Sequence, residues 1–450
     1  MAVRLLQYSD IESAHDRPER IGRLAGLLAD LRDEHTLVVG TGDDTAPGVL
    51  SLVTEGRQAL EFFSRVEPDL ETVGNHDLDH GLDAIREVVT DSPQTWVATN
   101  VYRGDPPAIP DAAEYADRFG ADACVVPTAV REVDGTRIGM FGVLDPATPE
   151  LTPPAAELSV TDPVETAERA IEDLRARGVD QVVALSHVGR GDDDIARETD
   201  VDVVLGGHVH ETRLEEIAGT LLTRPGANAR WLVELQFAAG EWTGVRHDVT
   251  EAPIDRDVER AYRNQFAVAD LDSVVGSLDD PIERSADVVR GGPCRVGRLV
   301  AEAYRGATGA DVGLQNTSGI KFGPPLSGSV TAADLVALTP FRDPVAVFEL
   351  SGRNLRSVLA ERDGANVSSA PDGRWMGHVS GVEATTEEDQ YLVGGESLDP
   401  DGTYTLATSD YLRRANGEFP ALSGLEPVEL TEQTQYEVLV EYVREHGRLS

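Results

Sequence analysis

Cysteine is nearly absent from this chain, since Cys124 and Cys294 are the only two among 450 residues. They are far apart and lie in no metal-binding spacing, so the sequence excludes a disulfide framework and is consistent with a reducing compartment. No apolar run approaches the ~20 residues that a membrane-spanning helix needs. No charged and apolar leader precedes the first expected strand, which starts near Val3. We therefore expect a cytoplasmic protein with no membrane partner.

Lysine is rarer still, because Lys321 is the only one. The 39 basic residues are outnumbered by 80 acidic ones, which gives a net charge of -41. The acids are dispersed among periodic apolar residues, so we expect a folded chain and not a disordered one. This composition is typical of a halophile, whose salt-loaded cytoplasm shortens the Debye length to about 3 Å at 1 M. So much negative charge argues against a nucleic-acid partner, and no feature indicates an obligate protein partner.

The chain is long enough for two to three domains. Strand-like and helical patterns alternate over residues 1–250 and predict an α/β domain. Residues 251–290 are expected to connect the domains through a charged helix and a looser acidic stretch at 270–280, and residues 291–450 to form a smaller α+β domain. The expected helices are 17–32, 163–177, 255–268, 296–308 and 434–446. The expected strands are 3–8, 37–40, 70–73, 96–99, 138–144, 182–185, 203–205, 221–223, 232–237, 345–350 and 404–407.

Short polar motifs follow five of the expected strands. In open α/β sheets the strand ends on one edge converge on a single crevice. One Asp or His at such a place is usually a cap or a structural residue, but an ordered set of oxygen and imidazole ligands predicts a centre for Mn, Zn, Fe or Mg. The motifs are Asp10-x-Glu12, Gly42-Asp43, Gly74-Asn75-His76-Asp77, Ser186-His187 and Gly206-Gly207-His208-Val209-His210.

This ordered set resembles the motifs of the calcineurin-like metallophosphoesterases. Residues 74–79 (Gly-Asn-His-Asp-Leu-Asp) and 206–210 resemble the branch that includes the 5′-nucleotidases. In the second half, residues 316–321 (Asn-Thr-Ser-Gly-Ile-Lys) are similar to that family's Asn-x-Gly-Gly-Ile-Arg, and 338–341 (Leu-Thr-Pro-Phe) to its Pro-Phe element. Tyr411 with Asn416-Gly417-Glu418 resembles its Phe…Gly-Gly-Asp. The resemblance covers essentially the whole chain and implies an N-terminal β-sandwich flanked by helices and a nucleotidase-type C-terminal domain.

The resemblance also implies a pair of divalent metal ions bridged by one carboxylate. Such a pair lowers the pKa of a shared water and draws charge off the phosphoryl oxygens. Mn²⁺ is the expected ion, with Zn²⁺, Mg²⁺, Co²⁺ and Fe as alternatives. The bridge would be Asp43, with Asp10, Glu12 and His210 on one ion and Asn75, His187 and His208 on the other.

Two further N-terminal features follow from the resemblance. His76 would be a non-ligand catalytic histidine on the phosphoryl or leaving oxygen, and Asp79 would orient it and favour the imidazolium. Glu12 departs from the family, which usually has histidine there. Its carboxylate would favour harder ions; in the alternative interpretation Glu12 is a bystander and His15 or water fills the position.

In the C-terminal half the resemblance implies a substrate site. Phe341 and Tyr411 align with two aromatic residues that sandwich a nucleobase, a contact of roughly 1–3 kcal/mol per base. Lys321 replaces an arginine that binds phosphate, and lysine cannot form a bidentate fork. Asp343 occupies a position that is often Asn. The full set of expected substrate-binding residues is Arg290, Asn316, Lys321, Phe341, Tyr411 and Glu418.

The sequence thus predicts a dinuclear metal-dependent phosphohydrolase that releases phosphate from nucleoside 5′-monophosphates, with a small nucleotide as its partner. Two alternatives of similar chemistry are a 2′,3′-cyclic-nucleotide phosphodiesterase/3′-nucleotidase and a nucleotide-sugar pyrophosphatase. A third alternative is a catalytically silent metal- or nucleotide-binding protein, which Glu12 and Lys321 make conceivable.

Overall fold

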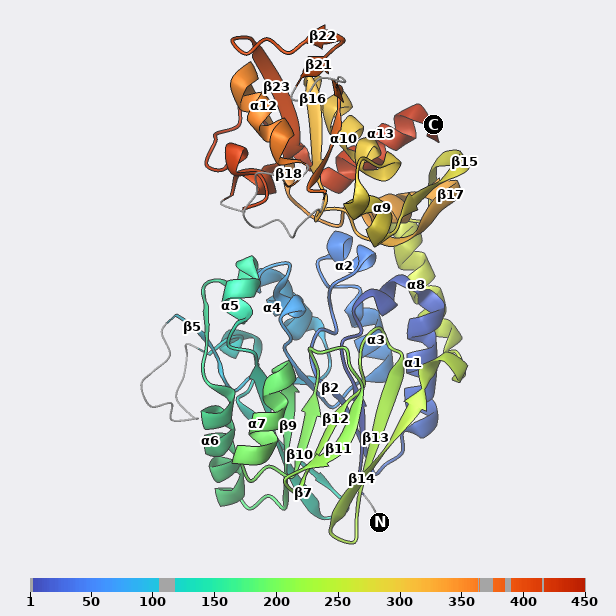
Figure 1. Cartoon of the computed structure of the whole chain (residues 1–450). Helices are drawn as coiled ribbons and strands as arrows, with labels where there is room; N and C mark the ends of the chain where they lie inside the picture. The colour runs from blue at the N-terminus through green and yellow to red at the C-terminus, as the bar shows by residue number, and fades with distance from the viewer. Residues whose placement is uncertain are drawn as a thin grey trace. The chain divides into compact units, whose positions relative to one another are not determined.

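The computed structural model describes residues 3–104, 118–362, 364, 375–384, 390–414 and 417–449. The chain divides into two compact units, which we call unit 1 (residues 1–269) and unit 2 (residues 270–450). Figure 1 traces both units along the chain from blue to red. Within the described ranges, no helix combines the length and apolar character that a bilayer crossing requires.

Unit 1 is built on two six-stranded sheets. Parallel pairing of β1 with β2 and of β7, β9 and β10 with one another brings the carboxyl ends of these strands to the same sheet edges. The first sheet has the order β14 (Glu241–Asp248), β13 (Trp231–Ala238), β1 (Val3–Tyr8), β2 (Thr36–Gly40), β3 (Leu70–Thr72) and β4 (Thr95–Val97). The second has the order β11 (Arg213–Ile217), β12 (Thr220–Arg224), β10 (Val203–Gly206), β9 (Gln181–His187), β7 (Thr136–Leu144) and β6 (Thr128–Val133). A separate pair joins β5 (Val101–Arg103) to β8 (Leu158–Val160).

The two sheets enclose one apolar core. Buried side chains from both meet there, among them Leu5 and Val39 of the first sheet and Met140, Val183 and Leu205 of the second. Unit 1 is therefore the β-sandwich that the resemblance implied.

Helices cover the outer faces of the sandwich (Figure 1). Beside the second sheet, Ile171 of α6 and Ile195 of α7 join a cluster with Phe141 and Val204. Asp162 caps α6 by accepting from the N–H groups of the first turn. The unit 1 helices are α1 (Pro18–Leu31), α2 (Val49–Thr54), α3 (Ala59–Val66), α4 (Leu82–Asp91), α5 (Thr148–Leu151), α6 (Pro163–Ala176), α7 (Asp192–Glu198) and α8 (Arg256–Val268).

Unit 2 has a five-stranded sheet as its centre, flanked by two three-stranded sheets. Apolar side chains of α10 and α13 pack on one side of the five-stranded sheet, and those of α12 pack on the other. The central order is β19 (Gly377–Ser380), β16 (Val312–Asn316), β23 (Thr403–Ser409), β18 (Pro344–Ser351) and β24 (Glu429–Thr434). The others are β17 (Gly323–Thr331), β15 (Val274–Arg284) and β25 (Arg448–Leu449), and β20 (Val382–Ala384), β21 (Tyr391–Val393) and β22 (Glu396–Ser397). The helices are α9 (Ala286–Gly291), α10 (Arg295–Thr308), α11 (Ala332–Val336), α12 (Gly352–Glu361) and α13 (Gln435–His446).

The predicted helices and strands are confirmed, with ends within about two residues of the expected ones. The interpretation of 270–280 as a loose acidic stretch is wrong, because this segment lies within or next to strand β15. β15 pairs with β17 through several register shifts, so its buried residues Val275, Leu278 and Ile282 do not alternate regularly. Helix α8, expected as part of the connection, belongs to unit 1.

A buried histidine makes the stability of unit 2 depend on pH. His378 lies on β19, 2% exposed, near the Cys294 thiol and the Thr317 hydroxyl. Burial lowers the pKa of His378 to about 4 from an ordinary 6.5, although a backbone hydrogen bond opposes the shift. The unfolded chain therefore binds the proton first as the pH falls.

We expect the neutral His378 to make its full contribution to the free energy of unfolding above pH 6.5. This contribution should be lost progressively as the pH falls toward 4. The loss should approach roughly 1.4 kcal/mol per pH unit, up to about 3 kcal/mol. The measurement is the free energy of unfolding of the wild type minus that of His378→Gln at several pH values in molar KCl. The exposed His446 of α13 supplies a matched control, His446→Gln. A difference that does not change between pH 6.5 and 4 contradicts the prediction.

Candidate metal centre and substrate cavity

Two groups of ligating side chains lie at the carboxyl edge of the unit 1 strands. In each group the ligand atoms lie within 4.8 Å of one another. One group is Asp10, Glu12 and His210, and the other is Asp43, His187 and His208. The backbone N–H of His208 donates to Asp10 Oδ1 at 3.1 Å, so the two groups are neighbours.

The first group combines two carboxylates and one imidazole. Glu12 Oε1 lies 2.8 Å from His210 Nε2, and Asp10 Oδ1 lies 3.7 Å from the same nitrogen. Burial raises the pKa of Asp10 to about 7; the charge of His187 opposes this shift and that of Asp43 adds to it. The short distance to His210 shows that the Glu12 carboxylate points toward the other two residues of this group. His15 does not replace it, since it is fully buried and contacts the Asp44 carbonyl and the Tyr262 hydroxyl.

The second group combines one carboxylate with two imidazoles. His187 and Asp43 are both almost fully buried, with Nε2 and Oδ2 3.0 Å apart. The other nitrogen of His187, Nδ1, lies 2.7 Å from the Thr41 carbonyl oxygen, which fixes the ring. Burial lowers the pKa of His187, but the charges of Asp43 and Asp10 outweigh it and raise the pKa to about 10. In the absence of an ion, a charged histidine thus neutralises the buried carboxylate.

Four of these side chains sit on backbone that L-residues rarely adopt. The φ angles are 49° at Asp10, 46° at Glu12, 56° at Asp43 and 69° at His208. Such strain clusters at functional sites and persists only where surrounding contacts enforce it. Asp77 supplies these contacts, because its carboxylate accepts from the backbone N–H of Asp43 at 2.9 Å, of Gly74 at 2.7 Å and of Thr45 at 2.9 Å. The sequence motif contained Asp77 but did not indicate this role.

The residues present fit a pair of divalent ions. Asn75 Oδ1 is buried without a hydrogen-bond partner among the described residues. A buried polar atom without a partner is costly, and a cation would satisfy this one. Asn75 lies on the turn whose next residue, His76, donates its N–H to Asp43 Oδ1 at 2.7 Å. Oxygen and imidazole donors suit Mn, Zn, Fe or Mg. The bridging role of Asp43 stays a prediction.

His76 and Asp79 form the expected pair. His76 Nδ1 lies 2.8 Å from Asp79 Oδ2, and 40% of the His76 side chain is exposed. Burial lowers the pKa of His76, but the hydrogen bond to Asp79 and the charge of Asp43 outweigh it and raise the pKa to about 9. The imidazole is therefore cationic at neutral pH, as an interaction with a phosphoryl oxygen requires.

Two residues at the centre were missed by the sequence analysis. Asn228 donates from Nδ2 to Glu12 Oε2 at 3.2 Å. Asp145 Oδ2 lies 3.6 Å from His208 Nε2. Neither belongs to a recognised motif, and only the strand pairing brings them to this edge.

Unit 2 contains a separate cavity of about 300 Å³. Asn316 Nδ2 donates to Glu418 Oε2 at 3.0 Å, and Lys321 Nζ lies 5.0 Å from the centre of the Phe341 ring. Arg290 is not among the lining residues; its guanidinium lies 4.7 Å from the centre of the Phe322 ring. Asn416 falls outside the described residues. The lining includes five of the expected substrate residues, namely Asn316, Lys321, Phe341, Tyr411 and Glu418, together with Asp343.

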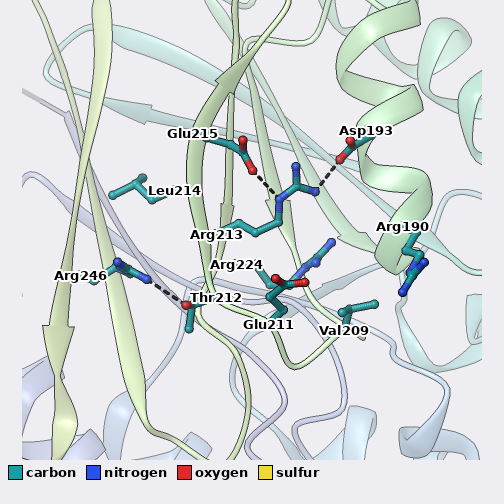
Figure 2. Close-up of a pocket in the computed structure, with 10 residues that line it drawn as sticks. All are labelled: Arg190, Asp193, Val209, Glu211, Thr212, Arg213, Leu214, Glu215, Arg224 and Arg246. Carbon is teal, nitrogen blue, oxygen red and sulfur yellow. Dashed lines mark hydrogen bonds and ion pairs between the residues drawn. The ribbon is translucent and has the colours of Figure 1, made fainter.

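A second cavity, this one in unit 1 and of about 680 Å³, lies beside the ligand loop and is lined by Val209 (Figure 2). Arg213 on its wall is bonded to Asp193 and Glu215. Arg224, which also lines the cavity and is 2% exposed, donates to the buried Asp192 at 2.6 Å. Asp192 in turn accepts from Ser186, the residue before His187, at 2.6 Å. This buried network links the end of β9, next to His187, to the end of β12.

Comparison with known proteins agrees with this fold. A family model for the 5′-nucleotidase C-terminal domain matches residues 274–424. The chain is 21% identical to the trifunctional nucleotide phosphoesterase YfkN of Bacillus subtilis (strain 168), over 96% of this chain and 33% of that protein. It is 22% identical to a 5′-nucleotidase of Vibrio parahaemolyticus serotype O3:K6, over 94% and 84%. A crystal structure of a 5′-nucleotidase precursor from Thermus thermophilus superposes with a TM-score of 0.69 at 20% identity, over 100% and 97%.

The sandwich of unit 1, with candidate ligands at its strand ends, shares its fold with the Thermus 5′-nucleotidase precursor. Residues 274–424 match the 5′-nucleotidase C-terminal domain, and the whole chain is similar in sequence to a 5′-nucleotidase and in fold to a 5′-nucleotidase precursor. The chain spans about a third of the length of the Bacillus relative.

The buried pair of Arg224 and Asp192 gives a stability prediction. We expect Arg224→Met to lower the free energy of unfolding by about 3–5 kcal/mol, because it leaves a buried carboxylate unpaired. The double variant Arg224→Met, Asp192→Asn should recover part of this loss. The control is Arg197→Met, which breaks an exposed pair with Asp193 and should cost less than about 1 kcal/mol. Equal losses in the two single variants, measured by denaturant unfolding in molar KCl, would contradict the prediction.

Proposed function

We propose that the chain is a dinuclear metal-dependent phosphohydrolase that releases phosphate from nucleoside 5′-monophosphates. The observation that carries the proposal is the pair of adjacent ligand groups on strained backbone, with a cationic His76 beside them. The names of the relatives add support for nucleotide substrates. We take Mn²⁺ as the native ion, because carboxylate and imidazole donors together suit it.

The residues would divide the work as follows. Asp10, Glu12, His210, Asn75, His187 and His208 would hold the ions with Asp43 between them. Bound ions would supply Lewis acidity for a water nucleophile and positive charge for the phosphoryl oxygens. His76, kept cationic by Asp79, would donate a hydrogen bond to a phosphoryl or leaving oxygen.

In unit 2 the cavity would recognise the nucleotide. Phe341 and Tyr411 line it, and Tyr411 is 41% exposed, so its ring can offer surface to a base. Lys321, beside the Phe341 ring, would bind phosphate as a point charge. Asn316 and Glu418, bonded to each other, would contact ribose or phosphate. Arg290, outside the cavity lining, remains a proposed phosphate contact.

The chemistry would work in a salt-rich cytoplasm. The net charge of -41 supports this setting because concentrated ions screen it. Both cysteines are free, which is compatible with a reducing compartment. We therefore expect activity to require molar salt. Retained activity in dilute buffer would contradict this expectation.

The test is hydrolysis in molar KCl with Mn²⁺ of AMP, other 5′-monophosphates, 2′,3′-cyclic AMP and UDP-glucose, followed by phosphate release for the monophosphates and by chromatography of the nucleotide products for the other two. Rapid release from the 5′-monophosphates, abolished by a chelator, is the expected result. Turnover of the cyclic nucleotide or the nucleotide sugar alone would replace the substrate assignment by the corresponding alternative. No turnover with any divalent ion would favour the silent binding protein.

The His76–Asp79 pair gives a kinetic prediction. Asp79→Asn should lower kcat on the order of 10-fold to 100-fold, because the imidazolium loses its carboxylate partner. Metal affinity should stay unchanged, since neither residue is a proposed ligand, and Asp79→Glu should restore part of kcat. Asp83→Asn, an exposed acid of the following helix, is the control. An unchanged kcat in Asp79→Asn would remove the pair from the mechanism.

A further inference from the structure

A carboxylate outside the expected ligand set lies against the metal centre. Asp145 directly follows β7, whose last residue, Leu144, pairs in parallel register with His187 of β9. The backbone N–H of Asp145 donates to the His187 carbonyl oxygen at 3.1 Å. The strand register therefore fixes Asp145 at the edge where the ligands converge.

One side-chain oxygen of Asp145 accepts a backbone hydrogen bond, and the other lies near His208. Oδ1 accepts from the backbone N–H of Ala147 at 2.8 Å. Oδ2 lies 3.6 Å from Nε2 of His208, which is an ion-pair distance and slightly long for a hydrogen bond. Each side chain is about a quarter exposed, with 26% for both.

Two neighbours lie against the ring of His208. The His187 ring meets it edge-on at 5.1 Å between centres. A Cβ on Gly189 would come within 2.7 Å of His208 Cδ2, so this glycine, with φ of +67°, allows the loop to lie against the ring. The ring therefore has little freedom, and its Nε2 side faces Asp145.

We propose that Asp145 is a positioning residue for the metal ligand His208. Its carboxylate accepts the Nε2–H of the imidazole, which fixes the tautomer and leaves Nδ1 for the ion. Imidazole ligands commonly bind a carboxylate through the second nitrogen, which orients the ring and raises its basicity. Asp145 acts through His208 and not as a ligand, because it lies outside the group of Asp43, His187 and His208 whose ligand atoms are mutually close. The inference rests on the metal centre of the proposed function.

Asparagine at this position separates the two roles of Asp145. Its side-chain oxygen can still accept from the Ala147 N–H and keep the turn. The remaining amide group then presents a donor to the Nε2–H of His208, so donor faces donor. Asp145→Glu keeps the acceptor and the charge.

The experiment is a calorimetric titration of the metal-free full chain with Mn²⁺ in molar KCl. We expect Asp145→Asn to weaken one of the two binding events by about 10-fold to 100-fold, and Asp145→Glu to restore most of the affinity. Asp200→Asn, an exposed acid of unit 1, should bind like the wild type. Unchanged affinity in Asp145→Asn would overturn the proposal, and so would an equal weakening of both events.

A second readout reports the tautomer directly. With Mg²⁺ or Zn²⁺ bound, nitrogen NMR of histidine should show a protonated Nε2 on His208 in the wild type, and a loss or shift of that signal in Asp145→Asn. A protonated Nδ1 in the loaded wild type would overturn the proposal. These outcomes do not depend on hydrolysis. Two bound ions without turnover would contradict the proposed activity alone. A wild type that binds no ion would contradict both the proposed activity and the role of Asp145.

Discussion

The structure of unit 1 depends on the burial of negative charge at the ends of its strands. Asp43 and Asp10 are 1% and 0% exposed, and Glu12 is 5% exposed. An unpaired buried carboxylate is expensive, so this edge must be neutralised. In the absence of ions His187 provides one positive charge, with its Nε2 at 3.0 Å from Asp43. His210 beside Glu12 and the cationic His76 near Asp43 add further positive charge, and divalent cations would neutralise this edge as well.

Other buried contacts of unit 1 hold these groups in backbone conformations that L-residues rarely adopt. Asp77 keeps the Asp43 loop in its strained conformation through four hydrogen bonds and binds the Gly74 N–H of its own turn by a fifth. Arg224 donates to Asp192, which in turn accepts a hydrogen bond from Ser186, the residue before His187. Both supports are buried and charged, so the stability of the fold is coupled to the geometry of the site. Strain at the ligands is offset by contacts several residues away, a common arrangement at functional sites.

Much of this could be predicted from the sequence because the signals are local. Apolar periodicity located α1 and β9, and polar residues after successive strands located Asp10, Asp43 and His187, which the sheets bring together. Asp145 and Asn228 could not be found in this way, since their partners, His208 and Glu12, lie far away in the chain. β15 was missed because its register shifts break the alternation by which strands are recognised. Arg290 was expected to contact phosphate from the resemblance, and this stays a prediction; its guanidinium lies over the Phe322 ring.

The departure at Glu12 has a physical meaning in this framework. Glu12 is held by His210 at 2.8 Å and by Asn228 at 3.2 Å, and it shares the left-handed backbone of Asp10 and Asp43. A bystander would not need these contacts. The two ligand groups then differ in character, because one has two carboxylates for a single imidazole and the other has two imidazoles for a single carboxylate. Oxygen-rich sites favour hard ions and nitrogen-rich sites favour borderline ones. As a ligand in the proposed function, Glu12 would shift the preference of its own group toward a harder ion and leave that of the group around His187 and His208 unchanged.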